Sequence, residues 1–301
     1  MLANTWTSIV EANVRTYGEI VLGIDPYLPD VPAAFEQAND GTDWLPRYLD
    51  FILEITVGEI GFVKFQSAYF EAYGLAGLSA LSLAMKRARA AGMGVILDAK
   101  RGDIGSTAAA YARAYLTPIH AGGSGDFEAD CLTVNPMMGP DTLEPFVECV
   151  RRYGKGLFVL CRTSNPSAGW LQDRMTGNRF VSDRLADLIT TIGKDSALDS
   201  GLSPVGAVIG TTAPQEGKRL RHLLPNAIIL APGLGPQGGS PTALNALRGS
   251  RPEDLLVPVS RGLLRTEDRT ISLSDYQMLV KKRLEQLKAM LAAQQNLSAA
   301  G

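Results

Sequence analysis

The sequence predicts a (β/α)8 barrel, an α/β fold in which eight parallel strands close on themselves inside a ring of helices. Short apolar runs typical of buried strands alternate with longer segments whose apolar residues recur at helical spacing. Eight such runs occur within 301 residues, and eight β/α alternations are the pattern of this fold. Polar and charged residues follow most of the runs directly, where the active sites of such barrels lie. An open, doubly wound parallel sheet is the alternative fold.

The strands are predicted from runs of four or five residues that are mostly apolar and often β-branched, as buried parallel strands are. The first run, Ile20-Val21-Leu22-Gly23-Ile24, is representative. In chain order the predicted strands are 20–24, 61–65, 95–98, 131–134, 156–160, 206–209, 227–230 and 255–259.

The helices are predicted from apolar residues that recur every three or four positions. The helix at 106–116 begins with the hydroxyl side chains of Ser106 and Thr107, which suit a helix N-terminus. The other helices between strands are predicted at 44–57, 75–91, 140–153, 181–192 and 214–224, with a shorter one at 242–248.

Two helices are predicted outside the β/α alternation. Residues 5–17 form one that is placed to close the bottom of the barrel. The other starts at Ser274, and its apolar face consists of Tyr276, Val280, Leu284, Leu287 and Leu291. No linker or internal repeat divides the chain, so residues 1–301 are predicted to form one domain, with a frayed tail at 293–301.

The composition excludes several classes of protein. Hydrophobic residues make up 46% of the chain, and 29 basic against 31 acidic residues leave a net charge of −2. This balance does not favour binding to nucleic acid or to another polyanion. No stretch approaches the ~20 apolar residues of a membrane helix, and the start lacks the charged and apolar regions of a signal peptide. A cytoplasmic protein is therefore expected.

The cysteines and histidines indicate neither metal nor nucleophilic chemistry. Cys131, Cys149 and Cys161 lack metal-type spacing, and their odd number argues against a disulfide framework and for a reducing compartment. We expect all three to be inert core residues. His120 and His222 lie away from the predicted strand ends. No metal ligand set and no triad of nucleophile, histidine and carboxylate is therefore expected.

A cluster of charged residues is predicted at the carboxyl ends of the first three strands. Asp25 ends the first strand, Lys64 lies in the second, and Asp98 and Lys100 share one face of the third. Asp103 follows shortly after. Nearby carboxylates favour the protonated form of a lysine, and a protonated lysine is able to protonate a carbanion and offset its charge. A structural ion-pair network is the alternative interpretation, but so many charges at adjacent strand ends favour catalysis.

Two further loops carry polar groups suited to a ligand. The glycine-rich segment 232–239, which contains Gln237, and Arg261 after the eighth strand have the composition of a phosphate site. A flexible surface loop with an arginine paired elsewhere is the alternative. Segment 162–180, which includes Ser164, is predicted to be a lid with hydroxyl and amide donors for a planar polar ligand, the alternative being a plain connection.

Segment 97–107 resembles the signature of the orotidine 5′-phosphate decarboxylase family, in the form of its longer, type 2 bacterial branch. Further segments resemble the other motifs of that family in chain order: 23–26, 62–66, 163–166, 232–239 and 260–262. The resemblance implies a cofactor-free and metal-free decarboxylation of orotidine 5′-monophosphate to UMP, the last step of de novo pyrimidine synthesis.

The resemblance also implies catalytic roles at matching positions. Lys100 is the general acid that protonates C6 after CO2 leaves, and Asp98 lies beside the substrate carboxylate. Lys64 holds the charged network together, and both Lys64 and Asp25 contact the ribose. Lys100→Ala is therefore expected to abolish turnover while the protein still folds.

Binding roles follow from the same resemblance. The family forms homodimers with composite sites, so Asp103 and Thr107 are expected to serve the partner subunit's site. Ser164 is expected to contact the pyrimidine, and Gln237 and Arg261 to hold the phosphate. The segment 117–127 is longer than a compact barrel needs and is not assigned, beyond a possible place at the dimer interface. Arg101 is not assigned to catalysis, because it faces away from the inward strand positions.

Two other functions are open to such a barrel. One is an Mg²⁺-dependent phosphosugar decarboxylase or aldolase with the same Asp-x-Lys-x-x-Asp pattern, such as 3-keto-gulonate 6-phosphate decarboxylase or hexulose phosphate synthase. Lys64 disfavours it, because those relatives are expected to carry a carboxylate metal ligand near that position. The other is a catalytically silent nucleotide-binding barrel, which the complete set of charged residues disfavours.

Overall fold

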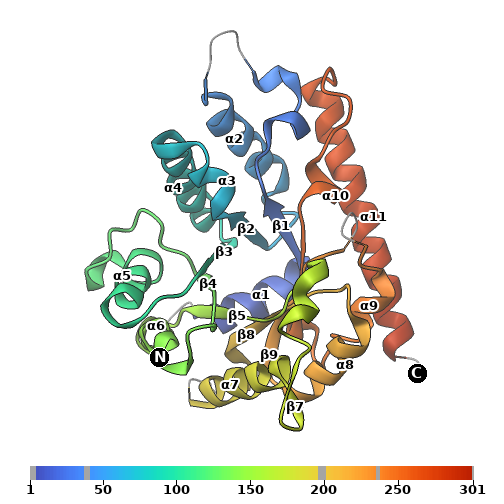
Figure 1. Ribbon diagram of the computed structural model, residues 1–301. Coiled ribbons are helices and arrows are strands. Elements are labelled where there is room, and N and C mark those ends of the chain that lie inside the picture. Colours follow the sequence, from blue (N-terminus) through green and yellow to red (C-terminus); the bar gives the residue numbers. More distant parts are fainter. Residues whose placement is uncertain (1–4, 37–40, 196–200, 235–237, 300–301) are drawn as a thin grey trace.

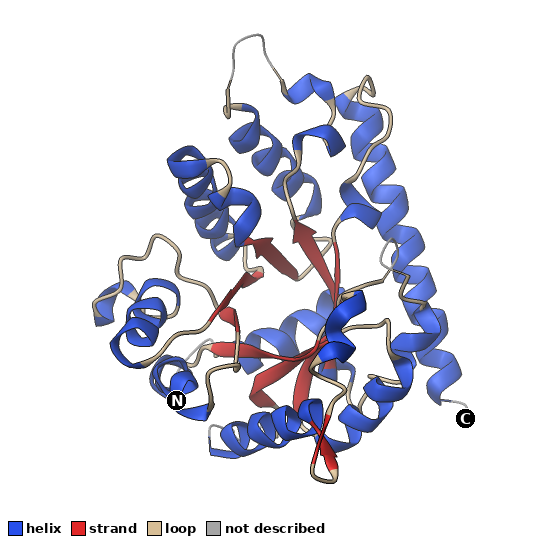
Figure 2. Cartoon of the chain, viewed as in Figure 1, coloured by secondary structure: helices blue, strands red, loops and turns tan. Residues whose placement is uncertain are grey.

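The computed structural model describes residues 5–36, 41–195, 201–234 and 238–299, and these form a closed barrel of eight parallel strands (Figure 2). The strands are β1 (Ile20–Ile24), β2 (Phe62–Gln66), β3 (Gly94–Arg101), β4 (Cys131–Val134), β5 (Gly156–Arg162), β8 (Ser203–Ile209), β9 (Ala227–Leu230) and β10 (Leu255–Val259). Each pairs in parallel with its neighbours, and β1 closes the ring against β10. The predicted (β/α)8 fold is confirmed, and the open sheet is excluded.

Helices surround this barrel at the predicted places (Figure 1). They are α1 (Trp6–Tyr17), α2 (Trp44–Thr56), α4 (Gly74–Ala90), α5 (Gly105–Tyr115), α6 (Glu144–Tyr153), α7 (Val181–Asp195), α8 (Pro214–Leu223), α9 (Pro241–Asn245) and α11 (Leu273–Ala299). The predicted helix at 140–153 begins as a 3-10 turn, Pro140–Leu143, before α6. The short helices α3 (Ser67–Glu71) and α10 (Arg261–Leu264) and a hairpin, β6 (Met175–Thr176) with β7 (Arg179–Phe180), were not predicted.

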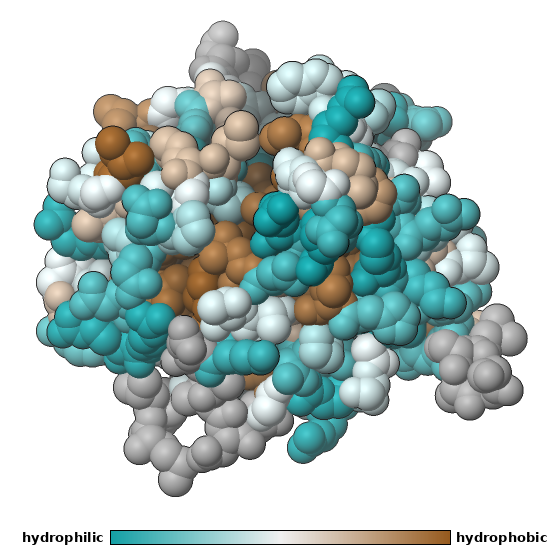
Figure 3. Space-filling model, turned by 60° about the horizontal axis from the view of Figure 1, so that its bottom comes forward, coloured by the Kyte–Doolittle hydropathy of each residue, from teal (hydrophilic) through white to brown (hydrophobic). Residues whose placement is uncertain are grey.

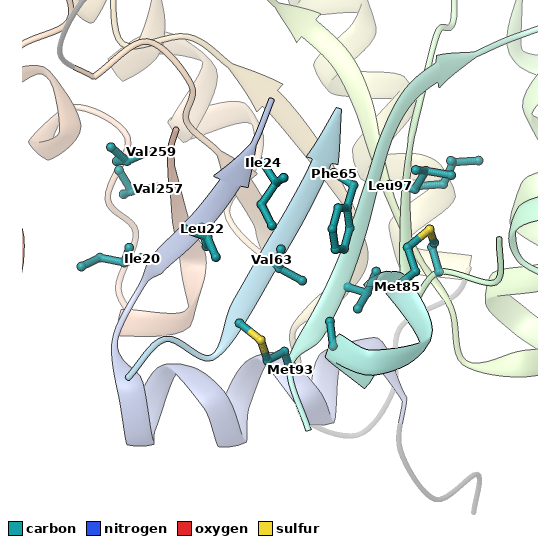
Figure 4. Close-up of a cluster of buried hydrophobic side chains, with 14 of the residues drawn as sticks. Ile20, Leu22, Ile24, Val63, Phe65, Met85, Met93, Leu97, Val257 and Val259 are labelled. Carbon is teal, nitrogen blue, oxygen red and sulfur yellow. The ribbon is translucent and has the colours of Figure 1, made fainter. Parts of the chain in front are cut away.

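Alternation of side chains along the strands creates two apolar cores. Inward-facing residues fill the barrel, and those of the first layer include Val21, Phe62, Ile96, Cys131 and Phe158. The next residue along each strand packs outward against the helices, as Figure 4 shows for a group that includes Leu22 of β1, Val63 of β2 and Leu97 of β3. The inner positions beyond the first layer therefore lead to the carboxyl end of the barrel.

Helix α1 closes the opposite, amino-terminal end, as predicted. Trp6 lies against Phe62 and Phe158 with edge-to-face geometry, at ring-centroid distances of 6.1 Å and 6.0 Å. A Cβ atom at Gly156, the first residue of β5, would lie 2.3 Å from Trp6 Cδ1. Glycine is therefore needed where the helix covers the start of this strand.

The frayed tail predicted at 293–301 is wrong as far as Ala299, because α11 continues to that residue. Asn245 Nδ2 donates to Gln294 Oε1 at 3.1 Å, and Gln295 Nε2 donates to Glu19 Oε2 at 3.0 Å. These side-chain bonds tie the last turns of α11 to α9 and to the start of β1, a contact that helical periodicity does not report.

Within the described ranges, no helix is both long and apolar enough to cross a bilayer. On the face in Figure 3 most side chains are hydrophilic, and hydrophobic residues gather in a hollow near the middle of the view. Cys131, Cys149 and Cys161 are all buried and free, as expected of core residues.

Candidate active site

A cavity of about 410 Å³ opens at the carboxyl end of the strands, within the size range of small-molecule sites. Its wall brings together residues from strands that are far apart in the sequence. Its polar lining consists of Asp25, Lys64, Gln66, Asp98, Lys100, Thr163, Ser164, Asn165, Ser260 and Arg261. Six of the nine predicted site residues line this cavity: Asp25, Lys64, Asp98, Lys100, Ser164 and Arg261. Asp103 and Thr107 do not line it, and Gln237 lies outside the described residues.

Four charged side chains form an alternating row along one wall of this cavity. Lys64 Nζ lies 3.0 Å from Asp98 Oδ2 and 3.8 Å from Asp25 Oδ1, and Lys100 Nζ lies 2.6 Å from Asp98 Oδ1. The side chains of Lys64 and Asp98 are 9% and 10% exposed, whereas that of Lys100 is 43% exposed. The two middle members of the row are therefore buried, whereas Asp25 at one end is 24% exposed and the Lys100 ammonium group at the other end is the most accessible from the cavity.

The charges in this row stabilise one another. Burial acts to raise the pKa of the Asp98 carboxyl, but the charges of Lys64 and Lys100 outweigh it and hold that pKa well below its usual range. Burial acts to lower the pKa of Lys64, but Asp98 and Asp25 outweigh it, so this pKa lies above its usual value. Asp98 is therefore an anion and Lys64 a cation at neutral pH.

Thr133 of β4 belongs to the same group, and the sequence analysis missed it. Its Oγ1 donates to Asp98 Oδ1 at 2.9 Å and accepts from the Lys100 backbone N–H at 2.9 Å. Thr133 follows Cys131 at the next inward position of the strand, and β4 pairs with β3. Strand alternation could have identified it as a polar residue facing the cluster.

Asp25 has an oxygen that the protein leaves unsatisfied. Its Oδ1 is buried and accepts no hydrogen bond, although Lys64 Nζ lies 3.8 Å away. A buried acceptor without a donor is unfavourable. The Asp25 side chain as a whole is 24% exposed and lines the cavity, so its carboxylate is able to accept a hydrogen bond from a hydroxyl group of a bound ligand.

Asp103 and Thr107 do not join the row within one chain. Asp103 Oδ1 accepts from the Ile104 backbone N–H at 2.8 Å, just before α5. Thr107 is exposed in the first turns of that helix. Neither side chain lines the cavity of its own barrel.

Side-chain hydrogen bonds hold the start of the segment after β5 in place beside the cavity. Arg162 Nε and Nη2 donate to the two carboxylate oxygens of Asp173 at 2.9 Å and 3.0 Å. Gln172 Oε1 accepts from the Thr163 backbone N–H at 2.8 Å. These bonds hold the short loop that presents Thr163, Ser164 and Asn165 to the cavity.

Another part of the cavity wall comes from the loops after β9 and β10, of which β10 pairs with β1. Gly233, Ser260, Arg261 and Gly262 line it, and the Arg261 side chain belongs to an exposed residue at the start of α10. A guanidinium group beside glycine backbone suits phosphate oxygens. Arg101 lies elsewhere, because its guanidinium pairs with Glu71 and lies over the rings of Tyr111 and Tyr115.

Comparison with known proteins points to one family. Residues 30–276 match the orotidine 5′-phosphate decarboxylase / HUMPS family. The orotidine 5′-phosphate decarboxylase of Rhodopirellula baltica is 38% identical over 266 residues, which cover 86% of this chain and 87% of the relative. That of Deinococcus radiodurans is 39% identical over 232 residues, covering 77% and 78%. The structure of Leishmania donovani OMP decarboxylase has a TM-score of 0.72 at 29% identity, covering 96% of this chain and 99% of that one.

Proposed function

The chain belongs to the orotidine 5′-phosphate decarboxylase / HUMPS family, and we propose that it converts orotidine 5′-monophosphate to UMP and CO2 without a cofactor, with Lys100 as the proton donor. This reaction is the last step of de novo UMP synthesis. The observation that carries the proposal is the alternating row Asp25, Lys64, Asp98 and Lys100, whose outermost ammonium group faces the cavity.

The row supplies what this decarboxylation requires. When the bond between C6 and the carboxylate breaks, its electron pair stays on C6, and the ring offers no electron sink in that plane. The Lys100 ammonium group offsets this charge and transfers a proton to C6, so that a C–H bond replaces the C–C bond. Solvent then reprotonates Lys100, whose side chain is 43% exposed.

Asp98 contributes by its charge and by its rigid placement. An anionic Asp98 beside the substrate carboxylate would repel it, and this repulsion is relieved when CO2 leaves. The contacts with Lys64, Lys100 and Thr133 hold Asp98 in place against that repulsion.

Groups remote from C6 would supply the binding energy that holds the substrate there. The Asp25 carboxylate, which belongs to a side chain 24% exposed in the cavity wall, suits a ribose hydroxyl, and Lys64 lies beside it. Ser164 is placed for the pyrimidine, and Arg261 for the phosphate. Gln237 is proposed as a second phosphate ligand from the resemblance alone.

We further propose a homodimer in which Asp103 and Thr107 complete the partner subunit's site. Both lie near the start of α5 and away from the cavity of their own barrel. Mixing inactive Lys100→Ala and Asp103→Ala proteins tests this arrangement. In a composite dimer one of the two sites regains both residues and activity returns, whereas mixtures that stay inactive after subunit exchange would contradict it.

A cytosolic location fits the three free cysteines.

The experiment that tests the reaction follows the ultraviolet absorbance of orotidine 5′-monophosphate mixed with the purified protein, with and without EDTA. Conversion to UMP that EDTA does not change is expected. The Mg²⁺-dependent phosphosugar enzymes are disfavoured because the Lys64 ammonium group stands between the carboxylates of Asp25 and Asp98. No conversion by a folded protein would refute the proposed function.

A further inference from the structure

We propose that Thr133 is a positioning residue for this reaction, whose hydroxyl group holds the Asp98 carboxylate and the Lys100 backbone in one arrangement. The proposal rests on the proposed function, because it concerns how Lys100 is aimed at the reacting carbon. Thr133 is 1% exposed and does not line the cavity, so it would act through its two neighbours.

The direction of each hydrogen bond at Thr133 follows from chemistry. The Lys100 backbone N–H is only a donor, so Thr133 Oγ1 accepts from it at 2.9 Å. The hydroxyl hydrogen is then available for the anionic Asp98, which only accepts, at 2.9 Å. A single hydroxyl group thus links the backbone of one residue in the row to the carboxylate of another.

The backbone at Lys100 needs such a link. Its φ is +49°, and no other non-glycine residue in the described ranges has a positive φ. Such a conformation is unfavourable for a residue with a Cβ atom and persists only where its surroundings hold it. The pairing of β3 with β4 shifts register between Leu97 and Arg101, so Lys100 lies in the interruption of the ladder. Thr133 Oγ1 therefore accepts the hydrogen bond that the Lys100 backbone N–H would otherwise donate to a carbonyl oxygen of the neighbouring strand.

The carboxylate side of the link is equally specific. Asp98 Oδ1 accepts from both Thr133 and Lys100 Nζ, while Asp98 Oδ2 accepts from Lys64. Three donors on two oxygens fix the plane of the carboxylate and, through it, the position of the Lys100 ammonium group. Without the hydroxyl group, Lys100 would lose both its backbone anchor and the fixed orientation of its charge partner.

The test compares Thr133→Val, which keeps the shape and removes the hydroxyl group, with Thr133→Ser, which keeps the hydroxyl group. The valine variant is expected to lower kcat by about 10- to 100-fold, as small misplacements of reacting groups do. KM and the Kd of UMP should change by less than about threefold, because the hydroxyl group does not touch the ligand cavity. The serine variant should restore kcat to within about threefold of wild type.

Thr56→Val is the matched control, since Thr56 is also 1% exposed and its hydroxyl group donates to the Ile52 carbonyl oxygen within α2. It should leave kcat unchanged. If Thr133→Val does not fold, Thr133→Ala takes its place against Thr133→Ser, since both shorten the side chain and only serine keeps the hydroxyl group. Wild-type kcat in the valine or alanine variant, or equal losses with and without the hydroxyl group, would overturn the proposal. A wild-type protein that does not decarboxylate orotidine 5′-monophosphate would instead refute the proposed function, and this inference with it.

Discussion

Lys64 and Lys100 both contact Asp98, but the structure predicts very different costs for replacing them with methionine. Lys64 and Asp98 are buried at 9% and 10% exposure, whereas the Lys100 side chain is 43% exposed. Removing one partner of a buried ion pair costs about 3–5 kcal/mol, because the other charge stays buried. An ion pair that water screens contributes at most ~1 kcal/mol. Lys64→Met should therefore destabilise the protein far more than Lys100→Met.

The assay is unfolding by urea and by heat at pH 7, together with turnover. With roughly 2 °C in Tm for each 1 kcal/mol in a chain of this size, Lys64→Met should lower Tm by about 6–10 °C and Lys100→Met by about 2 °C or less. Lys100→Met should nevertheless lose at least ~10²-fold in turnover as the missing general acid. Equal losses of stability in the two variants would refute the reasoning from burial, and near-normal turnover by folded Lys100→Met would refute the catalytic role.

Three further predictions concern charge, binding and reactivity. The low pKa of Asp98 means that its ionised form stabilises the fold above its unfolded pKa of about 3.9, and that this stability is lost as pH falls toward the lower folded pKa. The difference in unfolding free energy between wild type and Asp98→Asn should thus be constant from about pH 5 to 8 and shrink below about pH 4, and a difference that grows on acidification would contradict this sign. Arg261→Ala should raise KM for orotidine 5′-monophosphate at least ~10-fold, as loss of a charge-assisted phosphate contact does, while an unchanged KM would remove Arg261 from the phosphate site. Burial raises the pKa of the thiols of Cys131, Cys149 and Cys161, the last to about 12, so a disulfide reagent at pH 8 should modify them only after unfolding, and rapid labelling of the native protein would show that the barrel opens.

Much of the candidate site was predictable because strands are periodic. Asp25, Lys64, Asp98 and Lys100 occupy inward positions at the ends of three successive strands, and parallel strands bring those ends together. The same alternation marks Thr133, but a threonine in an apolar run is also an ordinary strand residue, so its role depended on seeing its partners.

The sequence by itself determined the barrel, the order of its strands and the end at which the polar residues gather, because the spacing of apolar residues is a local property of the chain. Only the tertiary structure decided the distances among the charges, the left-handed backbone of Lys100, its link to Thr133 and the helical continuation to Ala299. It also separated Asp103 and Thr107 from the cavity of their own barrel. These features arise from contacts between segments distant in sequence, which form when the barrel closes and which no local pattern encodes.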